Sequence, residues 1–322
     1  MSGYAAAKCV WRLGRRIPAA EDIEKGETMN RTHKKLDLSH VQTLIDLAVK
    51  EDFGRGDPTS EITTPPDVRG KADIVTREEI IVCGMEVVRE VLKRYDKRMR
   101  LRVLIADGER ANVTDRLGVI EGPLRSILSS ERVVLNFLQR LCGISTMTRK
   151  FVNAVKGTGA KIYDTRKTMP GWRYLEKYAV RCGGGYNHRM SLADAVMFKD
   201  NHVAELGSYL KPRLKKMVAE ARRRKGVKFV VVEVDHVDNQ LDRVLTIPGV
   251  DVILLDNMGQ WQLKHAVEMR NAMCGKRPLL EASGGVTLNN VLAIARCGVD
   301  RIAVGAITHS AAAVDIGIDR PE

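Results

Sequence analysis

The sequence predicts an α/β protein with two domains, a small α+β domain followed by a parallel α/β barrel. Three observations predict this fold. Strands and a helix intermingle in the first part of the folded chain, six strand patterns then alternate with helices, and each of those six strands ends in polar residues or glycine. Strands that alternate with helices build a parallel sheet, because each helix carries the chain back to the same edge.

Residues 1–35 are left out of this fold. They carry three arginines before the first acidic residue, Glu21, and they show no sustained hydrophobic periodicity. We expect a disordered extension, or a protein whose natural start is Met29, and a transit peptide is a further interpretation. A secretory signal is disfavoured because the segment lacks a long apolar core.

The predicted N-terminal domain covers residues 36–142. Ser39 is the expected N-cap of a first helix, whose apolar face runs from Val41 to Ala48 and which ends in the loop 51–57. Strand patterns follow at 71–76, 80–83 and 101–105, and a helix pattern lies at 86–94. This order indicates a mixed sheet with helices packed on it.

Residues 123–156 have helical periodicity with a break at Gly143, and we place the hinge between the domains at this break. The predicted barrel domain therefore covers residues 143–322. Its last residues could pack back on the N-terminal domain.

Strand and helix patterns alternate regularly in the second domain. The strands lie at 161–164, 195–199, 229–234, 252–255, 279–282 and 301–304, and the helices at 172–180, 208–225, 237–246, 259–273 and 287–296. An open doubly wound sheet gathers its ligand groups at one switch point, whereas a barrel directs every strand end to the same mouth. Because polar residues or glycines follow all six strands, a barrel is favoured, and one strand short of eight fits the pattern.

The composition is that of an ordinary folded protein with excess positive charge. Of the 322 residues, 44% are hydrophobic and 29% charged, and no apolar run reaches the roughly 18 residues of a membrane helix. The net charge of +13 fits nucleic acid, an anionic surface or anionic substrates as partners. The six cysteines include no C-x-x-C pair and no zinc spacing, so we expect a reduced, cytoplasmic protein.

Positively charged residues gather on turns and strand ends between Tyr163 and His202. They are Arg166, Lys167, His188, Arg189 and Lys199. Scattered cations usually form a solvated surface, but these lie beside glycines and at the ends of apolar strands. They exceed the need of one phosphate, and Arg suits bidentate binding of carboxylates. The predicted mouth therefore holds two polyanions, one phosphorylated and one carboxylated.

Two glycine-rich strand ends indicate where the phosphate binds. Ser283, Gly284 and Gly285 follow one strand, and Gly305 and Ala306 follow the next. Late barrel strands with glycine turns commonly bind phosphate through bare backbone N–H groups, although glycines also make ordinary turns.

Asp235 and Asp256 end neighbouring strands. They could share Mg²⁺ with substrate oxygens or bind ribose hydroxyls, and pairing with nearby cations explains them equally well. No cysteine or serine has an evident base partner, and neither G-x-G-x-x-G nor a Walker A motif occurs. Nucleophilic catalysis, a dinucleotide site and a P-loop site therefore have no support.

Several motifs resemble one family, in register and in order, from about residue 38 to 318. They are E-D-x-G-x-G-D-x-T (51–59), S-E-R-V-V-L-N-F-L-Q (130–139), T-R-K-T-x-P-G (165–171), G-G-G-x-N-H-R (183–189), K-D-N-H (199–202), V-E-V-D (232–235), L-L-D-N (254–257), E-A-S-G-G-V (281–286) and I-T-H-S (307–310). With them the chain resembles quinolinate phosphoribosyltransferase, the carboxylating nicotinate-nucleotide diphosphorylase of NAD synthesis. The resemblance implies transfer of phosphoribosyl from phosphoribosyl pyrophosphate to quinolinate, giving nicotinate mononucleotide, CO₂ and pyrophosphate.

The resemblance also implies an architecture and a set of site residues. The fold would be an N-terminal α+β sandwich domain followed by an incomplete, seven-stranded α/β barrel, assembled as a homodimer or as dimers of higher order, with Mg²⁺ as cofactor. The quinolinate carboxylates would be held by Arg132, reaching across from the partner subunit, and by Arg166, His188, Arg189 and Lys199. Lys167 and Lys199 would face phosphoribosyl pyrophosphate. Further substrate-binding residues would be Thr165, Glu233, Asp235, Asp256, Ser283, Gly284, Gly285, Val304, Gly305 and Ala306, with Asp235 and Asp256 also binding Mg²⁺.

A few positions depart from the family pattern. Asp235 stands where many members have Glu, which keeps the charge but shortens its reach. Cys142 and Ser145 replace small residues, which we interpret as packing changes, and Met169 fills a position often held by Thr. None of these changes removes a charged group, so the activity is expected.

Two other functions compete with this one. A paralogue of the same fold could use a different acceptor base, although such relatives lack much of the cation set. A basic nucleic-acid-binding protein could use residues 93–102 and 221–225, but neither run contains interleaved stacking aromatics, and aromatics are only 5% of the chain. The dipole of a helix that ends before Gly226 explains the second run.

Overall fold

A computed structural model of the chain describes residues 36–199 and 210–320, and residues 35–322 form one compact unit. Predictions for residues 1–35 and for the motif residues Asp200, Asn201 and His202 lie outside the described residues. Within the described part, no helix combines the length and the apolarity that crossing a membrane requires.

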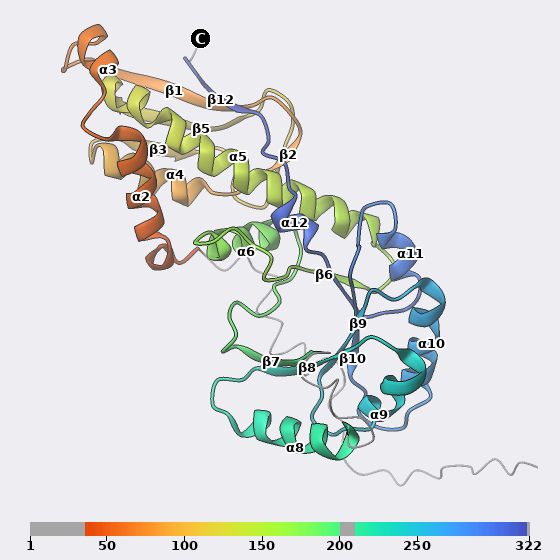
Figure 1. Ribbon diagram of the computed structural model, residues 1–322. Helices are drawn as coiled ribbons and strands as arrows, with labels where there is room; N and C mark the ends of the chain where they lie inside the picture. The colour runs from red at the N-terminus through yellow and green to blue at the C-terminus, as the bar shows by residue number, and fades with distance from the viewer. Residues whose placement is uncertain (1–35, 200–209, 321–322) are drawn as a thin grey trace, which may run out of the picture. The chain divides into compact units, whose positions relative to one another are not determined.

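The N-terminal domain is built on a four-stranded sheet with the order β12-β1-β5-β3 (Figure 1). Its strands are β1 (Arg69–Thr76), β3 (Arg100–Val103), β5 (Arg116–Pro123) and β12 (Ile316–Asp319), and β2 (Ile80–Ile81) pairs separately with β4 (Arg110–Ala111). Its helices are η2 (Leu38–His40), α2 (Gln42–Phe53), α3 (Pro58–Thr63), α4 (Met85–Tyr95) and the first part of α5 (Leu124–Ala154).

The α+β character of this domain agrees with the prediction, but its sheet is antiparallel rather than mixed. The sequence patterns missed β5, which lies between β1 and β3 and runs opposite to both. β12, from the far end of the chain, adds an edge strand beside β1.

The first helix begins later than predicted. The carboxylate of Asp37 accepts hydrogen bonds from the backbone N–H and the hydroxyl of Ser39, at 3.0 and 2.7 Å. These bonds cap the short 3₁₀ turn η2, and α2 then starts at Gln42 with Val41 at its N-cap. The prediction of Ser39 as N-cap was wrong, because an aspartate two residues earlier already engages both of its hydrogen-bonding groups.

α5 is one continuous helix of 31 residues, so the predicted break at Gly143 was wrong. Gly143 instead allows the segment around Ala312 to lie very close to α5. A Cβ atom built on it would lie 2.0 Å from the carbonyl oxygen of Ala312. The segment around Ala312 runs beside α5 and is tied to it by hydrogen bonds from the Val314 N–H to the Gln139 carbonyl, at 3.2 Å, and from the Gln139 side chain to the Ile316 carbonyl, at 3.0 Å.

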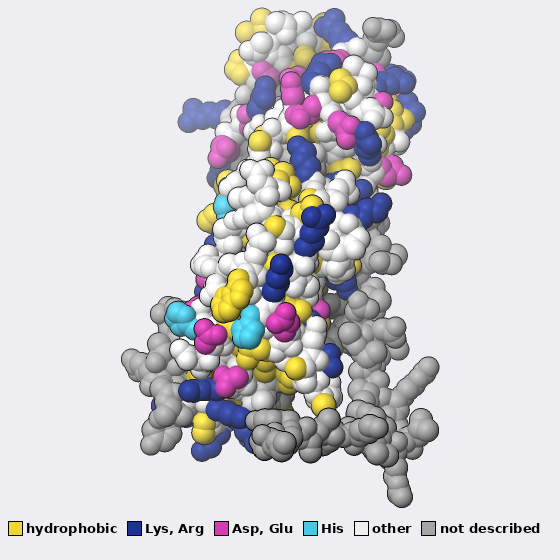
Figure 2. Space-filling view, turned by 90° about the vertical axis from the view of Figure 1, so that its right-hand side faces the viewer, with side chains coloured by type: hydrophobic (Ala, Val, Ile, Leu, Met, Phe, Trp, Pro, Cys, Tyr) yellow, Lys and Arg dark blue, Asp and Glu magenta, His cyan; other side chains and the backbone are white. Residues whose placement is uncertain are grey.

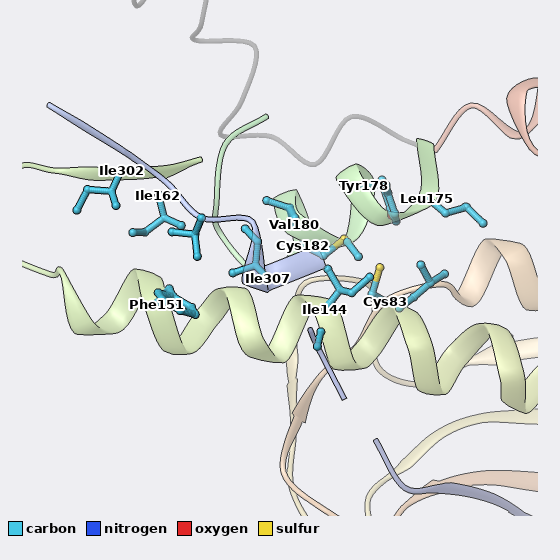
Figure 3. Packing of buried hydrophobic residues seen from close by; sticks show 14 of the residues in the cluster. Cys83, Ile144, Phe151, Ile162, Leu175, Tyr178, Val180, Cys182, Ile302 and Ile307 are labelled. Carbon is cyan, nitrogen blue, oxygen red and sulfur yellow. The ribbon is translucent and has the colours of Figure 1, made fainter. Parts of the chain in front are cut away.

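The buried face of α5 packs against elements from both domains. In Figure 3, apolar side chains of β6, β11 and α6 lie against this helix. On the N-terminal side, Cys142 Sγ accepts a hydrogen bond from the Cys83 N–H at 3.2 Å, and the Ser145 hydroxyl donates to the Ile81 carbonyl at 2.6 Å. Cys142 and Ser145, which we interpreted as packing changes, therefore also form hydrogen bonds with backbone groups of the N-terminal domain.

The second domain contains a six-stranded parallel sheet with the order β6-β11-β10-β9-β8-β7. The strands are β6 (Lys161–Tyr163), β7 (Ala195–Phe198), β8 (Phe229–Val234), β9 (Val252–Asp256), β10 (Leu279–Ser283) and β11 (Arg301–Ala303). The helices are α6 (Arg173–Cys182), α8 (Leu210–Arg223), η4 (Val237–Leu241), α9 (Asp242–Leu245), α10 (Gln260–Asn271), α11 (Val291–Ala295) and α12 (Ala306–His309). The first and last strands, β6 and β11, are neighbours, which is the order of a barrel and not of a doubly wound sheet.

The barrel is incomplete between β6 and β7, which lie at the two edges of the strand order. Tyr186 comes between them in the chain and forms a single parallel bridge with Tyr163. Within the described residues the barrel sheet therefore has six strands where seven were predicted, with the bridge at Tyr186 in the place of the seventh. The residues that follow, Asn187, His188 and Arg189, belong to no strand, so pairing ends after one bridge.

Alternation along the strands decides which side chains face the barrel interior. Val231, Val252 and Leu254 form a small buried cluster, separate from the large core that the helices share. Residues two positions further along a strand point to the same side. Glu233 therefore lies beyond Val231, and Asp256 lies beyond Leu254, at the carboxyl ends of their strands.

Replacing Gly143 with Ala tests the close contact of α5. In the interior of a helix this change ordinarily stabilises by about 1 kcal/mol. Here the added methyl group would collide with the Ala312 carbonyl, so we expect Gly143→Ala to lower the free energy of unfolding by about 2 kcal/mol, measured by urea denaturation.

Gly259→Ala is the matched control. Gly259 has a φ of −71°, and the nearest atom to an added Cβ is a Gln262 side-chain oxygen at 3.5 Å. We expect a change below about 1 kcal/mol. A Gly143→Ala protein as stable as the unmodified chain would contradict the contact.

Candidate active site

A cavity of about 670 Å³ opens at the carboxyl ends of the barrel strands. Residues on or directly after each of the six strands line it, together with residues of α6, of α12 and of the segment after Tyr186. The lining consists of Thr165, Arg166, Lys167, Arg173, His188, Arg189, Met197, Lys199, Glu233, Leu254, Asp256, Glu281, Ser283, Gly284, Gly285, Val286, Ala303, Gly305, Ala306 and His309. Its position is where a barrel brings chemistry together.

Every residue predicted for the site lines this cavity except Arg132, Asp235 and Val304. Val304 is fully buried. Asp235 comes two residues after Glu233, beyond the end of β8. Arg132 is exposed on α5 and lines a different cavity, of about 350 Å³, together with Asp57.

The turn after β6 carries Arg166 and Lys167 and is held by two threonines. The Thr165 hydroxyl accepts a hydrogen bond from the Lys167 N–H at 3.0 Å, and the Thr308 hydroxyl donates to the Lys167 carbonyl at 2.7 Å. The backbone of the turn is thereby fixed, so its two cations enter the cavity from a rigid base.

Arg189 is buried, and its guanidinium donates to the Ala195 carbonyl at 3.0 Å. Burial, followed by the positive charge of Arg166, lowers the pKa of Arg189. Both causes act against the charged form. The cavity therefore concentrates positive charge that an anionic ligand would neutralise.

Deeper in the barrel, a buried carboxylate compensates other cations. Glu281 is fully buried, with Oε2 at 2.6 Å from Arg301 Nε and Oε1 at 3.4 Å from His188 Nε2. The Arg301 guanidinium also lies 3.7 Å from the centre of the Tyr163 ring. Burial alone would raise the pKa of Glu281, but the positive charge of Arg301 and the contact with the His188 ring outweigh it and hold the pKa at about 2. This carboxylate is ionised at neutral pH.

The turn after β10 has a backbone that suits an anion. Gly284 and Gly285 have φ values of +90° and +58°, which favour glycine. A Cβ atom on Gly284 would lie 2.1 Å from the Asn257 side-chain oxygen, and that side chain donates to Asp256 at 2.9 Å. Bare backbone thus faces the cavity, as in sites that bind phosphate.

Glu233 and Asp256 are the carboxylates near the open end of the cavity. In the described part of the chain, the one group of three metal-binding side chains within 4.8 Å of one another is Cys83, Asp107 and Cys182, which does not line the cavity. A cation bound at the cavity would therefore need ligand oxygens besides one or two carboxylates. Mg²⁺ commonly binds in that way, so the residues fit it.

Seven residues of the cavity lining were not predicted as site residues. Four of them are apolar, namely Met197, Leu254, Val286 and Ala303, and three can carry charge, namely Arg173, Glu281 and His309. Glu281 could have been found from the strand alternation, because it precedes Ser283 by two positions on β10. His309 lies in a motif of the resemblance, but only the structure places its ring beside Gly305. No sequence pattern distinguishes Arg173 from a surface arginine.

A parallel barrel with a cationic cavity and a glycine turn at its carboxyl ends defines an α/β-barrel enzyme for anionic, phosphorylated substrates. Comparison with known families specifies it further. Residues 57–142 match the N-terminal domain of quinolinate phosphoribosyl transferase, and residues 144–319 match its C-terminal domain. The chain therefore belongs to the quinolinate phosphoribosyltransferase family.

Individual relatives agree with this assignment. The chain is 42% identical over 278 residues to the nicotinate-nucleotide pyrophosphorylase (carboxylating) of Mycobacterium leprae, which covers 85% of this chain and 95% of the relative. It is 35% identical over 309 residues to quinolinate phosphoribosyltransferase (decarboxylating) 2b, mitochondrial, of Nicotiana tabacum, covering 92% and 86%. The solved nicotinate-nucleotide pyrophosphorylase of Francisella tularensis superposes with a TM-score of 0.81 at 35% identity, covering 91% of this chain and 100% of that one.

The low pKa of Glu281 predicts a pH-dependent effect of Glu281→Gln. A carboxyl whose pKa falls from its ordinary 4.5 to about 2 on folding contributes stability above pH 4.5 and loses it as the pH falls toward 2. We expect the variant to be less stable by about 3 kcal/mol at pH 7, with the difference shrinking below pH 4.5, in urea denaturation between pH 7 and pH 3.

Glu121→Gln provides the comparison. Glu121 pairs with Lys71 at 2.8 Å on the surface, where water screens the charges. We expect little effect of this change at any pH. A destabilisation by Glu281→Gln that stays constant from pH 7 to pH 3 would count against an ionised, ion-paired Glu281.

Proposed function

We propose that the chain transfers the phosphoribosyl group of phosphoribosyl pyrophosphate to quinolinate, releasing pyrophosphate and CO₂ and forming nicotinate mononucleotide for NAD synthesis. The observation that carries the proposal is the cluster of cations in the cavity, where burial and a neighbouring charge lower the pKa of Arg189. Such a cluster suits an acceptor with two carboxylates. Family membership supports the same reaction.

The acceptor would bind at the cations and phosphoribosyl pyrophosphate at the glycine turns. Arg166 and Arg189 have the planar geometry for carboxylates, with His188 and Lys199 beside them. Lys167 and Lys199 would face the pyrophosphate. The 5′-phosphate and ribose would contact Thr165, Glu233, Asp256, Ser283, Gly284, Gly285, Gly305 and Ala306, and Val304 would support this turn from behind.

The reaction follows from the charges. The pyridine nitrogen attacks C1 of the ribose, the C1–O bond to pyrophosphate breaks, and its electron pair leaves with pyrophosphate. Positive charge develops on the ribose, where the carboxylates of Glu233 and Asp256 would stabilise it. The quaternised nitrogen then draws electrons from the ring. The bond to the 2-carboxylate breaks, CO₂ leaves, and the ring carbon takes a proton from water. The protein positions and neutralises the reactants.

Mg²⁺ would neutralise charge on the pyrophosphate. Asp256 lines the cavity, and Asp235 comes directly after β8, two residues beyond Glu233. We propose that Asp256 and Asp235 hold the ion together with pyrophosphate oxygens, with Glu233 as the nearest alternative carboxylate.

We further propose that the protein forms a homodimer, or an assembly of dimers, with Arg132 completing the partner's site. Arg132 is exposed and does not line the large cavity of its own chain. It can therefore contact quinolinate only in a second copy, which a closed two-fold interface permits.

A cytoplasmic location is part of the proposal. The described cysteines are all free thiols, as a reducing compartment maintains them: Cys83, Cys142, Cys182, Cys274 and Cys297. Fractionation of cells that express the full chain checks the location.

Nucleic-acid binding is the alternative of another class, and the surface disfavours it. On the face shown in Figure 2, the described Lys and Arg side chains are interspersed with acidic and apolar ones. Within the run 93–102, Lys93 pairs with Glu90 at 2.6 Å and Arg98 with Asp96 at 2.7 Å. Cations already paired with carboxylates contribute less to phosphate binding.

The reaction is tested by supplying phosphoribosyl pyrophosphate and Mg²⁺ with quinolinate or with nicotinate and measuring mononucleotide and CO₂. We expect product from quinolinate alone. Arg166→Ala should lower kcat/KM for quinolinate about 100-fold, because one charge-assisted contact is lost, while the surface variant Arg98→Ala should leave it unchanged. Product from nicotinate, or none from either acceptor, would reject the proposed acceptor and favour a paralogue of the same fold.

Mixing two inactive variants tests the shared site. Arg132→Ala removes the contribution to the partner, and Arg189→Ala damages the chain's own cavity. In a mixed dimer one complete site forms, so a statistical mixture should recover about a quarter of the unmodified activity. Equal activity for the mixture and the separate variants, with subunit exchange demonstrated by differently tagged chains, would reject a role of Arg132 across the interface.

A further inference from the structure

A buried ion pair lies behind the cavity without lining it. Asp164 follows β6 and Lys177 lies on α6, and their side chains are 0% and 1% exposed and in direct contact. The Asn187 side chain donates to Asp164 Oδ2 at 2.6 Å and to the Lys177 carbonyl at 2.8 Å. Burial raises the pKa of Asp164 and lowers that of Lys177, and their mutual attraction opposes both shifts.

Such a pair is a poor source of stability. Removing two charges from water costs several kcal/mol, and well-packed apolar residues often replace a buried pair without loss of stability. Its value therefore lies in what the two charged groups bind besides each other.

The ion pair holds both backbone groups of one residue in the cavity lining. The His188 N–H donates to Asp164 Oδ1 at 2.7 Å, and Lys177 Nζ donates to the His188 carbonyl at 3.0 Å. His188 and Arg189 line the cavity, whereas Asp164 and Lys177 do not. The charged groups thus act on the site through the backbone.

The His188 ring also has a polar neighbour at each nitrogen. Nδ1 accepts a hydrogen bond from the Arg189 N–H at 2.7 Å, and Nε2 faces Glu281 at 3.4 Å. A nitrogen that accepts carries no proton, so the neutral ring bears its proton on Nε2. Any rotation of the His188 backbone would disturb both contacts and would move Arg189 with them.

We propose that Asp164 and Lys177 are positioning residues that lock the turn of His188 and Arg189 into the geometry that binds the carboxylated acceptor. The inference rests on the proposed function for the identity of that acceptor. The two residues do not touch the substrate. They set the direction of the side chains that do.

Two double variants distinguish the effect of the backbone contacts of Asp164 and Lys177 from the effect of their charges. Asp164→Leu with Lys177→Met removes both charges and both backbone contacts. Asp164→Asn with Lys177→Gln removes the charges but keeps groups that can accept from the His188 N–H and donate to its carbonyl. We expect the apolar pair to raise KM for quinolinate at least about tenfold, with KM for phosphoribosyl pyrophosphate within about twofold. The polar pair should show a smaller rise, of about threefold.

A second ion pair of the barrel serves as matched control. Asp300 Oδ2 accepts from Arg270 Nη1 at 2.7 Å and from the Leu280 N–H at 2.8 Å, so it too combines a charge contact with a backbone contact. It does not line the cavity. Arg270→Met with Asp300→Leu should leave KM for quinolinate unchanged. The inference is overturned if the control and the apolar pair change this KM alike, or if folded variants of Asp164 and Lys177 leave it unchanged. Should the apolar pair not fold, the polar pair decides.

A spectroscopic measurement makes the test independent of turnover. In ¹⁵N-histidine-labelled protein, the signal of His188 is assigned by its absence in His188→Gln. We expect a single neutral tautomer with the proton on Nε2 in the unmodified chain, and an average of tautomers in the apolar pair. A His188 signal unchanged by the apolar pair overturns the inference. An unmodified chain without activity on quinolinate rejects the proposed function, and the His188 signal still decides the positioning role.

Discussion

The contact between Gly143 and the Ala312 carbonyl permits the arrangement on which much of the structure depends. Because no side chain stands at position 143, the C-terminal segment lies directly on α5 and continues into β12, the edge strand of the N-terminal sheet. One turn earlier on the same helix, Arg140 contacts Glu176 of α6 at 2.6 Å and donates to the Ala311 carbonyl at 3.0 Å. A single unbroken helix thus joins the N-terminal sheet to the elements around the barrel mouth, and any break in it would separate them.

Some of the buried charges in the barrel have a counter-charge beside them, and others do not. At depth, the ionised Glu281 balances Arg301 and faces His188, so the floor of the cavity is close to electrical balance. Nearer the mouth, Arg189 is buried beside Arg166 and its pKa is lowered. A buried cation that lacks a counter-charge in the free protein attracts an anionic ligand more strongly than a cation that is already paired, because the ligand supplies the missing counter-charge. The proposed dicarboxylate acceptor would supply that counter-charge.

The same logic applies to the residues that hold the site from behind. Thr165 and Thr308 fix the turn after β6, and Asp164 and Lys177 fix the backbone of His188. None of these contacts creates charge in the cavity. They fix the orientation of the charged side chains. In phosphoribosyl transfer the protein mainly positions the reactants and neutralises their charge, so the orientation of these side chains decides much of the rate.

The sequence by itself determined the parallel barrel, the polar strand ends and most of the cavity lining. These depend on local patterns: strands that alternate with helices place every strand end at one mouth, and motifs such as T-R-K-T name the residues there. Alternation along β10 also places Glu281 on the side of Ser283, although Glu281 was not among the predicted site residues. The tertiary structure decided the features that depend on contacts between residues distant in the sequence. Gly143 looks like a helix break until Ala312 lies against it, and Ser39 looks like a cap until Asp37 binds it first. Asp164 and Lys177 read as ordinary charges until the fold buries them together, because burial, pairing and the direction of a backbone are set by contacts between residues distant in the chain.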